Sequence, residues 1–285
     1  MPPIQKILFG SPGTGKSYKV REIAQQELDI TYDEASGILE NTVKTVFHPE
    51  YTHADFMGKL MPLTQGEKVT YKFYAGHFLQ VLGEAYKSII NGETASYLLV
   101  IDELNRGNAS AIFGSIFQLL DREDDGWSSY DIQLSDMELY ALLEITLSSE
   151  LFIESNGLEV RNEKGNRVTI NNFWDEKIYQ YRKAPPENEL DSQVIKDAGR
   201  LITLLRRHKI SLPPNLSILC TINTSDESIY YLDSAFKRRW DWEYIDIPTD
   251  GYLSDLPSEL FGTMLVINGH EKGLWINILQ ALMNS

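Results

Sequence analysis

The sequence predicts an α/β fold built on a five-stranded parallel sheet with helices on both sides. Two observations lead to this prediction. Five short apolar runs, typical of buried strands, are separated by segments with the 3.6-residue periodicity of helices. The first run also ends in a glycine-rich turn, and a helical pattern follows directly at residues 16–28. Strands and helices that alternate in this way are typical of a doubly wound parallel sheet.

The expected strands lie at residues 4–9, 42–47, 97–101, 216–222 and 243–247. Helices are expected at residues 16–28, 76–90 and 109–120, where apolar side chains recur at helical spacing. The run at 97–101 is continuously apolar, which indicates a central strand buried on both faces.

Residues 124–214 fit this plan less well, and we interpret them as an insertion in the core. A turn at 164–166 between two alternating apolar segments predicts a β-hairpin. This hairpin could be a pore loop, a contact for a partner or a part that packs on the core. Asp191 and Ser192 are candidate N-caps for a helix with apolar side chains at 194–205.

The composition excludes several classes of protein. The chain has 285 residues, of which 42% are hydrophobic, enough to bury a full core. Its formal net charge of −15 disfavours a protein that coats nucleic acid with its whole surface, although a local basic patch stays compatible. The single cysteine, Cys220, excludes an internal disulfide and indicates a reducing compartment. Without a leader or a long apolar run, we expect a cytoplasmic protein with no membrane contact.

The strongest motif lies between the first strand and the first helix. It matches G-x-x-x-x-G-K-[ST] in full, with the residues Gly10, Ser11, Pro12, Gly13, Thr14, Gly15, Lys16 and Ser17. Glycines at these positions let backbone N–H groups turn inward around phosphates, and the helix N-terminus adds partial positive charge. We expect Lys16 to reach the β- and γ-phosphates and the Ser17 hydroxyl to bind Mg²⁺. Tyr18 completes the predicted binding segment.

A second motif ends the third predicted strand. The apolar run delivers Asp102 and Glu103 to the polar end of the strand, in the form of a Walker B motif. Asp102 is predicted to hold the Mg²⁺ shell, and Glu103 to orient and polarise the attacking water as a general base. The alternative is an ordinary strand end that meets solvent. The glycine-rich loop upstream favours the catalytic interpretation.

Two further polar clusters follow the fourth predicted strand. The segment from Cys220 to Asp226 contains Asn223 and could hydrogen-bond a γ-phosphate or the attacking water, but a Ser/Thr turn explains it equally well. Arg238 and Arg239 end a short helix, where cations suit the helix dipole. Their position before the last strand favours the alternative, an arginine finger that reaches the nucleotide of a neighbouring subunit.

These four motifs, in this order, resemble the AAA+ family of P-loop NTPases. The segments between them resemble McrB-like proteins, the GTP-driven motor subunits of modification-dependent restriction systems. The block from Phe47 to Phe56 resembles FHxxYxxxDF, and the block from Tyr71 to Gly76 resembles an aromatic stretch before a helix. Ile101 to Asn108 is close to IDEINRAN, Ile222 to Asp226 is similar to MNTAD, and Leu232 to Trp240 resembles VDxALRRRF.

The resemblance implies a ring of subunits, usually a hexamer, that binds GTP rather than ATP between neighbours. It implicates Asn223 and Asp226 in hydrolysis and places Arg238 and Arg239 where trans-acting arginines occur. It also implies an McrC-like nuclease subunit as partner and contact with DNA through the complex. On this pattern residues 1–248 are the AAA+ core, with the insertion at about 124–214, and residues 249–285 are a partial C-terminal helical lid with a helix at 273–283.

We therefore predict an Mg²⁺-dependent nucleoside triphosphatase that acts as the motor of a DNA restriction complex. Two alternatives stay open. The first is an ATP-dependent AAA+ factor that remodels proteins, which a preference for ATP would support. The second is a nucleotide-gated assembly module, which negligible turnover together with nucleotide-dependent assembly would support.

Overall fold

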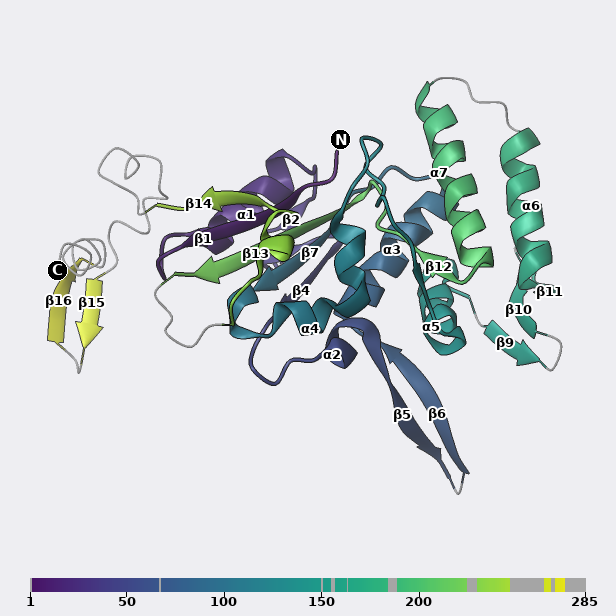
Figure 1. Cartoon of the computed structure of the whole chain (residues 1–285), viewed down its shortest axis with the longest axis horizontal. Coiled ribbons are helices and arrows are strands. Elements are labelled where there is room, and N and C mark those ends of the chain that lie inside the picture. The colour runs from purple at the N-terminus through teal and green to yellow at the C-terminus, as the bar shows by residue number, and fades with distance from the viewer. Residues whose placement is uncertain are drawn as a thin grey trace.

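The central sheet has five parallel strands, as predicted, and its strand order positions the candidate site (Figure 1). Across the sheet the strands are β14 (Asp241–Tyr244), β1 (Gln5–Gly10), β13 (Leu216–Asn223), β7 (Tyr97–Asp102) and β4 (Thr42–Val46). The computed structural model describes residues 2–66, 68–149, 151–154, 157–162, 164–183, 189–224, 230–246, 264–267 and 270–274. Because β13 lies directly beside β1, its carboxyl end meets the glycine-rich loop.

The two faces of the sheet are covered by different helices. On one face, Leu8, Val100 and Leu219 pack against α1 (Lys16–Gln26). On the other face, alternate residues of the same strands join a larger core that includes α3 (His77–Asn91). The alternation follows from the two-residue period of a strand, and burial on both faces confirms the prediction for the central strand.

Two predicted elements differ in detail. The last strand was expected at 243–247, whereas β14 begins two residues earlier and residue 247 lies outside the described residues. The single helix expected at 109–120 is divided into α4 (Ala109–Phe113) and the 3₁₀ helix η2 (Gly114–Leu120). Gly114 has a φ of 52°, which an α-helix does not accommodate, and its position allows the ring of His53 to approach closely.

The insertion follows η2 and packs on the α3 side of the core. Its elements are β8 (Ile132–Gln133), α5 (Asp136–Leu147), β9 (Leu151–Glu154), β10 (Gly157–Arg161), β11 (Arg167–Thr169), α6 (Ile170–Lys183), α7 (Glu189–Arg206) and β12 (Lys209–Ile210). The predicted hairpin is confirmed as β10–β11, and β9 extends it to three strands. Leu158 and Val160 of this hairpin are buried in the main core, which favours packing over an exposed pore loop.

The N-cap prediction for the helix in the insertion was wrong. Asp191 and Ser192 lie inside α7, because Glu189 and Leu190, both good helix formers, already belong to the helix. Another helix of the insertion, α5, does have a side-chain cap, because Ser135 and Glu138 form a capping box.

A long two-stranded hairpin projects from the body of the molecule (Figure 1). It consists of β5 (Gly58–Gln65) and β6 (Lys68–Ala75), and it connects α2 (His53–Met57) to α3. The aromatic stretch expected before a helix is therefore a strand, β6, that leads directly into α3. A small ribbon of β2 (Tyr32–Asp33) and β3 (Ile38–Leu39) lies between α1 and β4 in the chain.

After β14 the described residues form one antiparallel pair, β15 (Met264–Ile267) and β16 (His270–Leu274). Where the C-terminal helix was expected to begin, residues 273 and 274 continue β16, and residues 275–283 lie outside the described residues. The rest of the expected lid at 249–285 also lies outside them. Among the residues that the structure describes, no helix has the length and apolar character needed to cross a membrane.

Candidate nucleotide-binding site

The glycine-rich loop has the backbone conformation that a phosphate cradle needs. Gly13 and Gly15 have φ values of 82° and 87°, in the left-handed region where side chains with a Cβ are strained. Gly15 is the N-cap of α1, and a Cβ there would meet nothing within 4 Å, so the backbone is open to a ligand. The first turn of α1 carries no acidic residue that would oppose its partial positive charge. The loop therefore fits an anion such as a phosphate.

Lys16 lies folded over this loop. Its side-chain Nζ donates to the carbonyl oxygen of Gly10 at 3.0 Å and to that of Ser11 at 2.8 Å, and the residue is buried. Thr14 supports the same loop, because its hydroxyl donates to the Ser11 carbonyl at 3.0 Å. The ammonium group is thus held beside the carbonyls of the glycine-rich loop.

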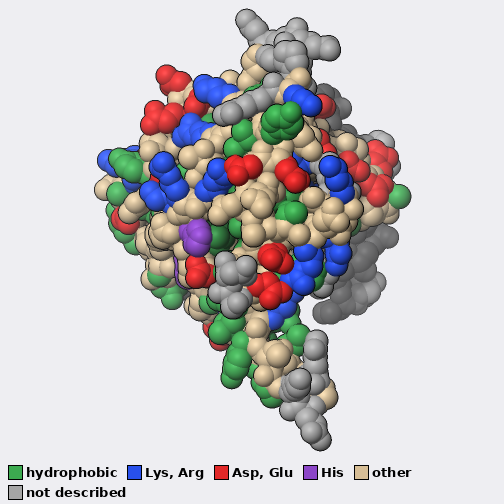
Figure 2. Space-filling model, turned by 90° about the vertical axis from the view of Figure 1, so that its right-hand side faces the viewer, with side chains coloured by type: hydrophobic (Ala, Val, Ile, Leu, Met, Phe, Trp, Pro, Cys, Tyr) green, Lys and Arg blue, Asp and Glu red, His purple; other side chains and the backbone are tan. Residues whose placement is uncertain are grey.

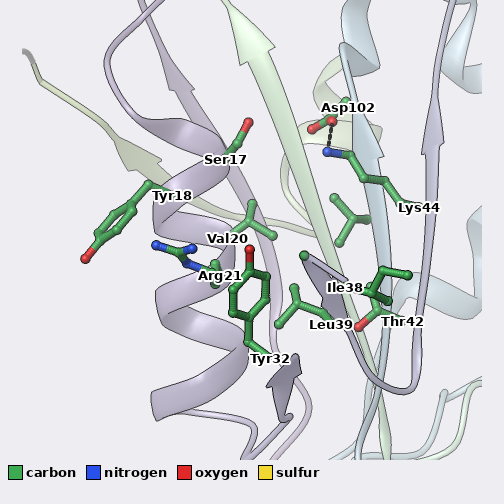
Figure 3. Close-up of a pocket in the computed structure, with 12 residues that line it drawn as sticks. Ser17, Tyr18, Val20, Arg21, Tyr32, Ile38, Leu39, Thr42, Lys44 and Asp102 are labelled. Carbon is green, nitrogen blue, oxygen red and sulfur yellow. Dashed lines mark ion pairs between the residues drawn. The ribbon is translucent and has the colours of Figure 1, made fainter. Parts of the chain in front are cut away.

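Asp102 is held at the end of β7 by two side chains from neighbouring strands. Lys44 of β4 forms an ion pair with its Oδ2 at 2.8 Å (Figure 3). The Thr221 hydroxyl of β13 donates to its Oδ1 at 3.1 Å. Asp102 and Ser17 line the same pocket of about 490 Å³, which runs along α1 to the β2–β3 ribbon. One carboxylate and one hydroxyl beside a phosphate cradle are oxygen ligands of the kind that suits Mg²⁺.

Glu103 stands at the centre of the polar cluster. Its backbone has a φ of 56°, an uncommon conformation for a residue with a side chain, and its N–H donates to the Thr221 hydroxyl at 3.2 Å. Its Oε1 accepts a hydrogen bond from the Asn223 side-chain amide at 2.5 Å. Asn223 pairs with Gly10 across the sheet, and the N–H of Thr224 donates to the Gly10 carbonyl. The loop, the carboxylate and the amide are thus parts of one connected site.

The structure separates the two adjacent arginines. Arg239 is fixed inside the chain: its guanidinium forms an ion pair with Asp121 at 2.7 Å, donates to the Ala235 carbonyl and lies over the ring of Phe117. Its side chain is only 8% exposed. Arg238 is exposed at the end of α8 (Ser234–Lys237), and it forms no ion pair or side-chain hydrogen bond with the described residues. Among the described residues, Arg238 is thus exposed to solvent, whereas Arg239 is engaged inside its own chain.

Other predicted residues contribute differently. The Tyr18 ring is half-exposed, contacts the guanidinium of Arg21 and points away from Ser17 and Asp102 (Figure 3). Asp226 lies outside the described residues. Cys220 is buried, and burial raises the pKa of its thiol, so the group stays protonated near neutral pH.

Sequence reasoning missed Lys44 as a site residue, and it included Thr221 in the cluster from Cys220 to Asp226 without predicting its contact with Asp102. Each stands in a predicted strand: Thr221 is a buried polar residue in an apolar strand, whereas Lys44 is exposed, so burial could have identified only Thr221. Only the alignment of three strands shows that both converge on Asp102.

The block from Phe47 to Phe56 contacts both the end of β7, which carries Asp102, and the start of α3. The Phe47 N–H donates to the carbonyl of Asp102 at 2.9 Å, so this block continues the β4–β7 pairing. Tyr51 stacks on Phe47, and its hydroxyl hydrogen-bonds His77 at 2.8 Å. A Cβ at Gly76 would lie 2.4 Å from the Phe56 carbonyl, so only glycine allows the start of α3 to pack this closely. These contacts join the projecting hairpin to the strand that carries Asp102.

Two known proteins with similar sequences are both components of restriction enzymes. The chain is 27% identical to the type II restriction enzyme BsuMI component YdiS of Bacillus subtilis strain 168, over 99% of the chain and 67% of that relative. It is 29% identical to the type IV methyl-directed restriction enzyme EcoKMcrB subunit of Escherichia coli strain K12, over 43% of the chain and 24% of that relative. The chain thus spans about two thirds of one relative and a quarter of the other.

No family model matches the chain. A crystal structure of a protein from Cytophaga hutchinsonii, assigned as an ATPase, aligns with 98% of the chain and 53% of its own length, at 13% identity and a TM-score of 0.36. So low a score adds nothing to the fold, which rests on the sheet order and the loop described above.

Proposed function

We propose that this chain, an McrB-like AAA+ protein, hydrolyses a nucleoside triphosphate with Mg²⁺ as the motor subunit of a DNA restriction complex. One observation carries the proposal. The Glu103 carboxylate contacts the Asn223 amide on the strand next to the phosphate loop. A carboxylate and an amide that meet beside a phosphate cradle have the arrangement needed to hold a water molecule in line with a terminal phosphate.

Each residue has a distinct part in this proposal. The backbone N–H groups of residues 11–16 and the Lys16 ammonium bind the phosphates. Ser17 and Asp102 would hold Mg²⁺, which supplies charge neutralisation to the phosphate oxygens when it is bound. Thr221 and Lys44 orient the Asp102 carboxylate. Glu103 accepts the proton of the attacking water, and the Asn223 amide fixes the orientation of Glu103.

Subunit contacts complete the site in this proposal. Arg238 is exposed at the end of α8. This helix lies beside the segment that follows Glu103, because the Ser110 hydroxyl donates a hydrogen bond at 3.3 Å to Asp233, the N-cap of α8. We assign Arg238, rather than Arg239, as the arginine that acts on the nucleotide of an adjacent copy in a ring, by inference a hexamer. The proposed substrate is GTP in preference to ATP, and the proposed partner is an McrC-like nuclease; both follow the resemblance to McrB-like proteins.

The test is hydrolysis of GTP and ATP with Mg²⁺, side by side, over a series of protein concentrations. We expect GTP to be preferred and the activity per chain to rise steeply with concentration, because shared sites form only on assembly. Glu103→Gln should keep nucleotide binding and lose turnover by about 10²–10⁴-fold. Normal turnover by Glu103→Gln would remove Glu103 from its role. A preference for ATP would favour protein remodelling, and nucleotide-dependent assembly without turnover would favour the assembly module.

A further inference from the structure

The charge of this acidic chain is distributed unevenly. Residues 161–209 contain eleven Lys and Arg against seven Asp and Glu, a formal charge of +4. The rest of the chain contains 15 Lys and Arg against 34 Asp and Glu, a formal charge of −19. The positive segment includes β11, α6, α7 and β12, which together form one end of the molecule (Figures 1 and 2). A local positive field on an acidic protein can attract a polyanion.

The basic side chains of this segment have two kinds of environment. Several are ion-paired with acidic groups and hold the insertion together. The pairs are Arg167 with Glu154 and Glu159, Arg200 with Asp125, Arg206 with Asp175 and Lys209 with Asp131. Three lysines line one groove beside α6: Lys164, Lys177 and Lys183. Figure 2 shows the same end, with Lys and Arg side chains spread between acidic ones. The groove is therefore a local feature of a mixed surface.

The groove combines these lysines with aromatic rings. It has a volume of about 520 Å³, and the Lys183 ammonium lies 5.1 Å from the centre of the Tyr179 ring. The Lys177 ammonium lies 5.9 Å from the ring of Phe173, which is buried beneath it. One carboxylate, that of Glu176, also lines the groove, and it accepts a hydrogen bond from Asn162. The charged lining groups thus have a net positive charge.

The spacing of these groups favours a polymer over a single phosphate ion. Lys177 and Lys183 are six residues apart on α6, a rise of about 9 Å along the helix. A free phosphate cannot span that distance, whereas a DNA strand offers a phosphate about every 3.4 Å along its axis. The Tyr179 side chain, 58% exposed, lies between the two lysines in the chain and can donate its hydroxyl to a phosphate oxygen. Lysine ammonium groups contact phosphates as point charges.

We propose that the groove lined by Lys164, Lys177 and Lys183 binds the sugar-phosphate backbone of DNA. The inference rests on the proposed function for the choice of DNA, and it adds that this chain itself contacts the DNA that the restriction complex acts on. The contact positions the DNA and reads no sequence, because the lining cations match phosphates.

The test uses the full chain and a fluorescently labelled DNA duplex, with binding followed by anisotropy from low to moderate salt. The groove variant is Lys164→Gln/Lys177→Gln/Lys183→Gln. The matched control is Lys59→Gln/Lys72→Gln/Lys87→Gln, which removes the same charge from lysines that form surface ion pairs elsewhere. We expect the groove variant to bind at least about tenfold more weakly and to lose about two to three units of salt slope, near 0.9 for each phosphate contact. The control should stay close to wild type.

Three results would overturn the inference: no binding by the wild-type chain at low salt, equal weakening of both triple variants, or loss of polyglutamate binding by the groove variant with DNA binding intact. The last result would indicate an acidic protein as ligand. Mg²⁺-dependent hydrolysis without DNA, measured on the same preparations, separates the two proposals. Turnover without groove-specific DNA binding removes only this inference, whereas groove-specific binding without turnover removes only the proposed function.

Discussion

The sheet edge that carries the candidate nucleotide site and the segment at 121–214, which includes the predicted insertion at about 124–214, are held in place by different kinds of contact. At this sheet edge, Lys16 bonds to carbonyls five and six residues before it, and Glu103 and Asn223 meet because parallel strands end at the same edge. In the segment at 121–214, side chains of single residues donate hydrogen bonds to groups that are mostly far away in the chain. Arg122 donates to the carbonyls of Gly126, Pro213 and Leu216, and the indole N–H of Trp127 donates to Asp197.

This difference shows that the site and the insertion have separate physical requirements. The site depends on the backbone conformation of the glycine-rich loop and on the order of β1, β13 and β7 in the sheet. Most of its side chains are partly exposed. The insertion needs pairing of buried groups, because an unpaired buried donor or acceptor costs about 1–3 kcal/mol. Site substitutions should therefore change chemistry with little change in stability, and insertion substitutions should do the reverse. The following predictions test that separation.

The neighbouring arginines give the largest expected contrast, because they belong to the two different regions. Arg238→Ala should lower turnover by about 10³-fold or more, as loss of a trans-acting arginine does, and leave the free energy of unfolding nearly unchanged. Arg239→Ala should instead destabilise the chain, because it breaks the partly buried ion pair with Asp121, which follows η2. Steady-state hydrolysis and urea unfolding measure both. A stable, inactive Arg239→Ala with a fully active Arg238→Ala would reverse the assignment.

Arg122→Leu should lower the free energy of unfolding by about 3 kcal/mol or more. The residue is half-buried, and desolvation lowers the pKa of its guanidinium, whose donors satisfy three carbonyls that would lose their partner. Urea unfolding measures the loss, with the exposed Arg207→Leu in the same segment as control. The folded fraction of Arg122→Leu should keep the nucleotide affinity of wild type. A wild-type midpoint would show that these contacts do not hold the insertion.

Lys16→Ala should weaken binding of a fluorescent nucleotide by about 10- to 150-fold. This is the loss expected when one hydrogen bond to a charged group, which contributes about 1.5–3 kcal/mol, is removed. Stability should fall by less than this, since Lys16 bonds to the Gly10 and Ser11 carbonyls of a partly exposed loop. Lys19→Ala, one turn further along α1 and paired with Glu22 at the surface, is the matched control. Equal affinity of the two variants would contradict the phosphate role of Lys16.

The smallest effect is expected at the base of the projecting hairpin, at a residue that belongs to neither the candidate site nor the segment at 121–214. Asp55 caps α2 by accepting hydrogen bonds from Thr52, and these bonds together with Lys59 lower the pKa of its carboxyl. Asp55→Asn should cost about 1 kcal/mol near neutral pH. The lowered pKa means that this stabilisation is present above the usual Asp pKa and is lost as the pH falls toward the pKa of the folded state. Unfolding of both proteins at neutral and acid pH measures it; a difference that persists in acid would point to packing.

Much of this molecule could be predicted from short stretches of sequence. The glycine-rich loop is local, because Gly13 and Gly15 determine its backbone whatever surrounds it. The five strands follow from apolar runs, and the position of Asp102, Glu103 and Asn223 at strand ends follows with them. The N-cap prediction at Asp191 and Ser192 failed because several residues can begin a helix, and the pattern does not say which.

The sequence by itself determined the glycine-rich loop, the strands and the residues at their carboxyl ends, since these depend on conformational preferences within a few residues. Tertiary structure alone decided that Lys44 and Thr221 converge on Asp102, that Arg239 is internal while Arg238 is exposed, and how the insertion is anchored. The physical reason is separation along the chain. Contacts between residues about 60 to 120 positions apart depend on strand order and on which buried groups find partners, and no local pattern encodes either.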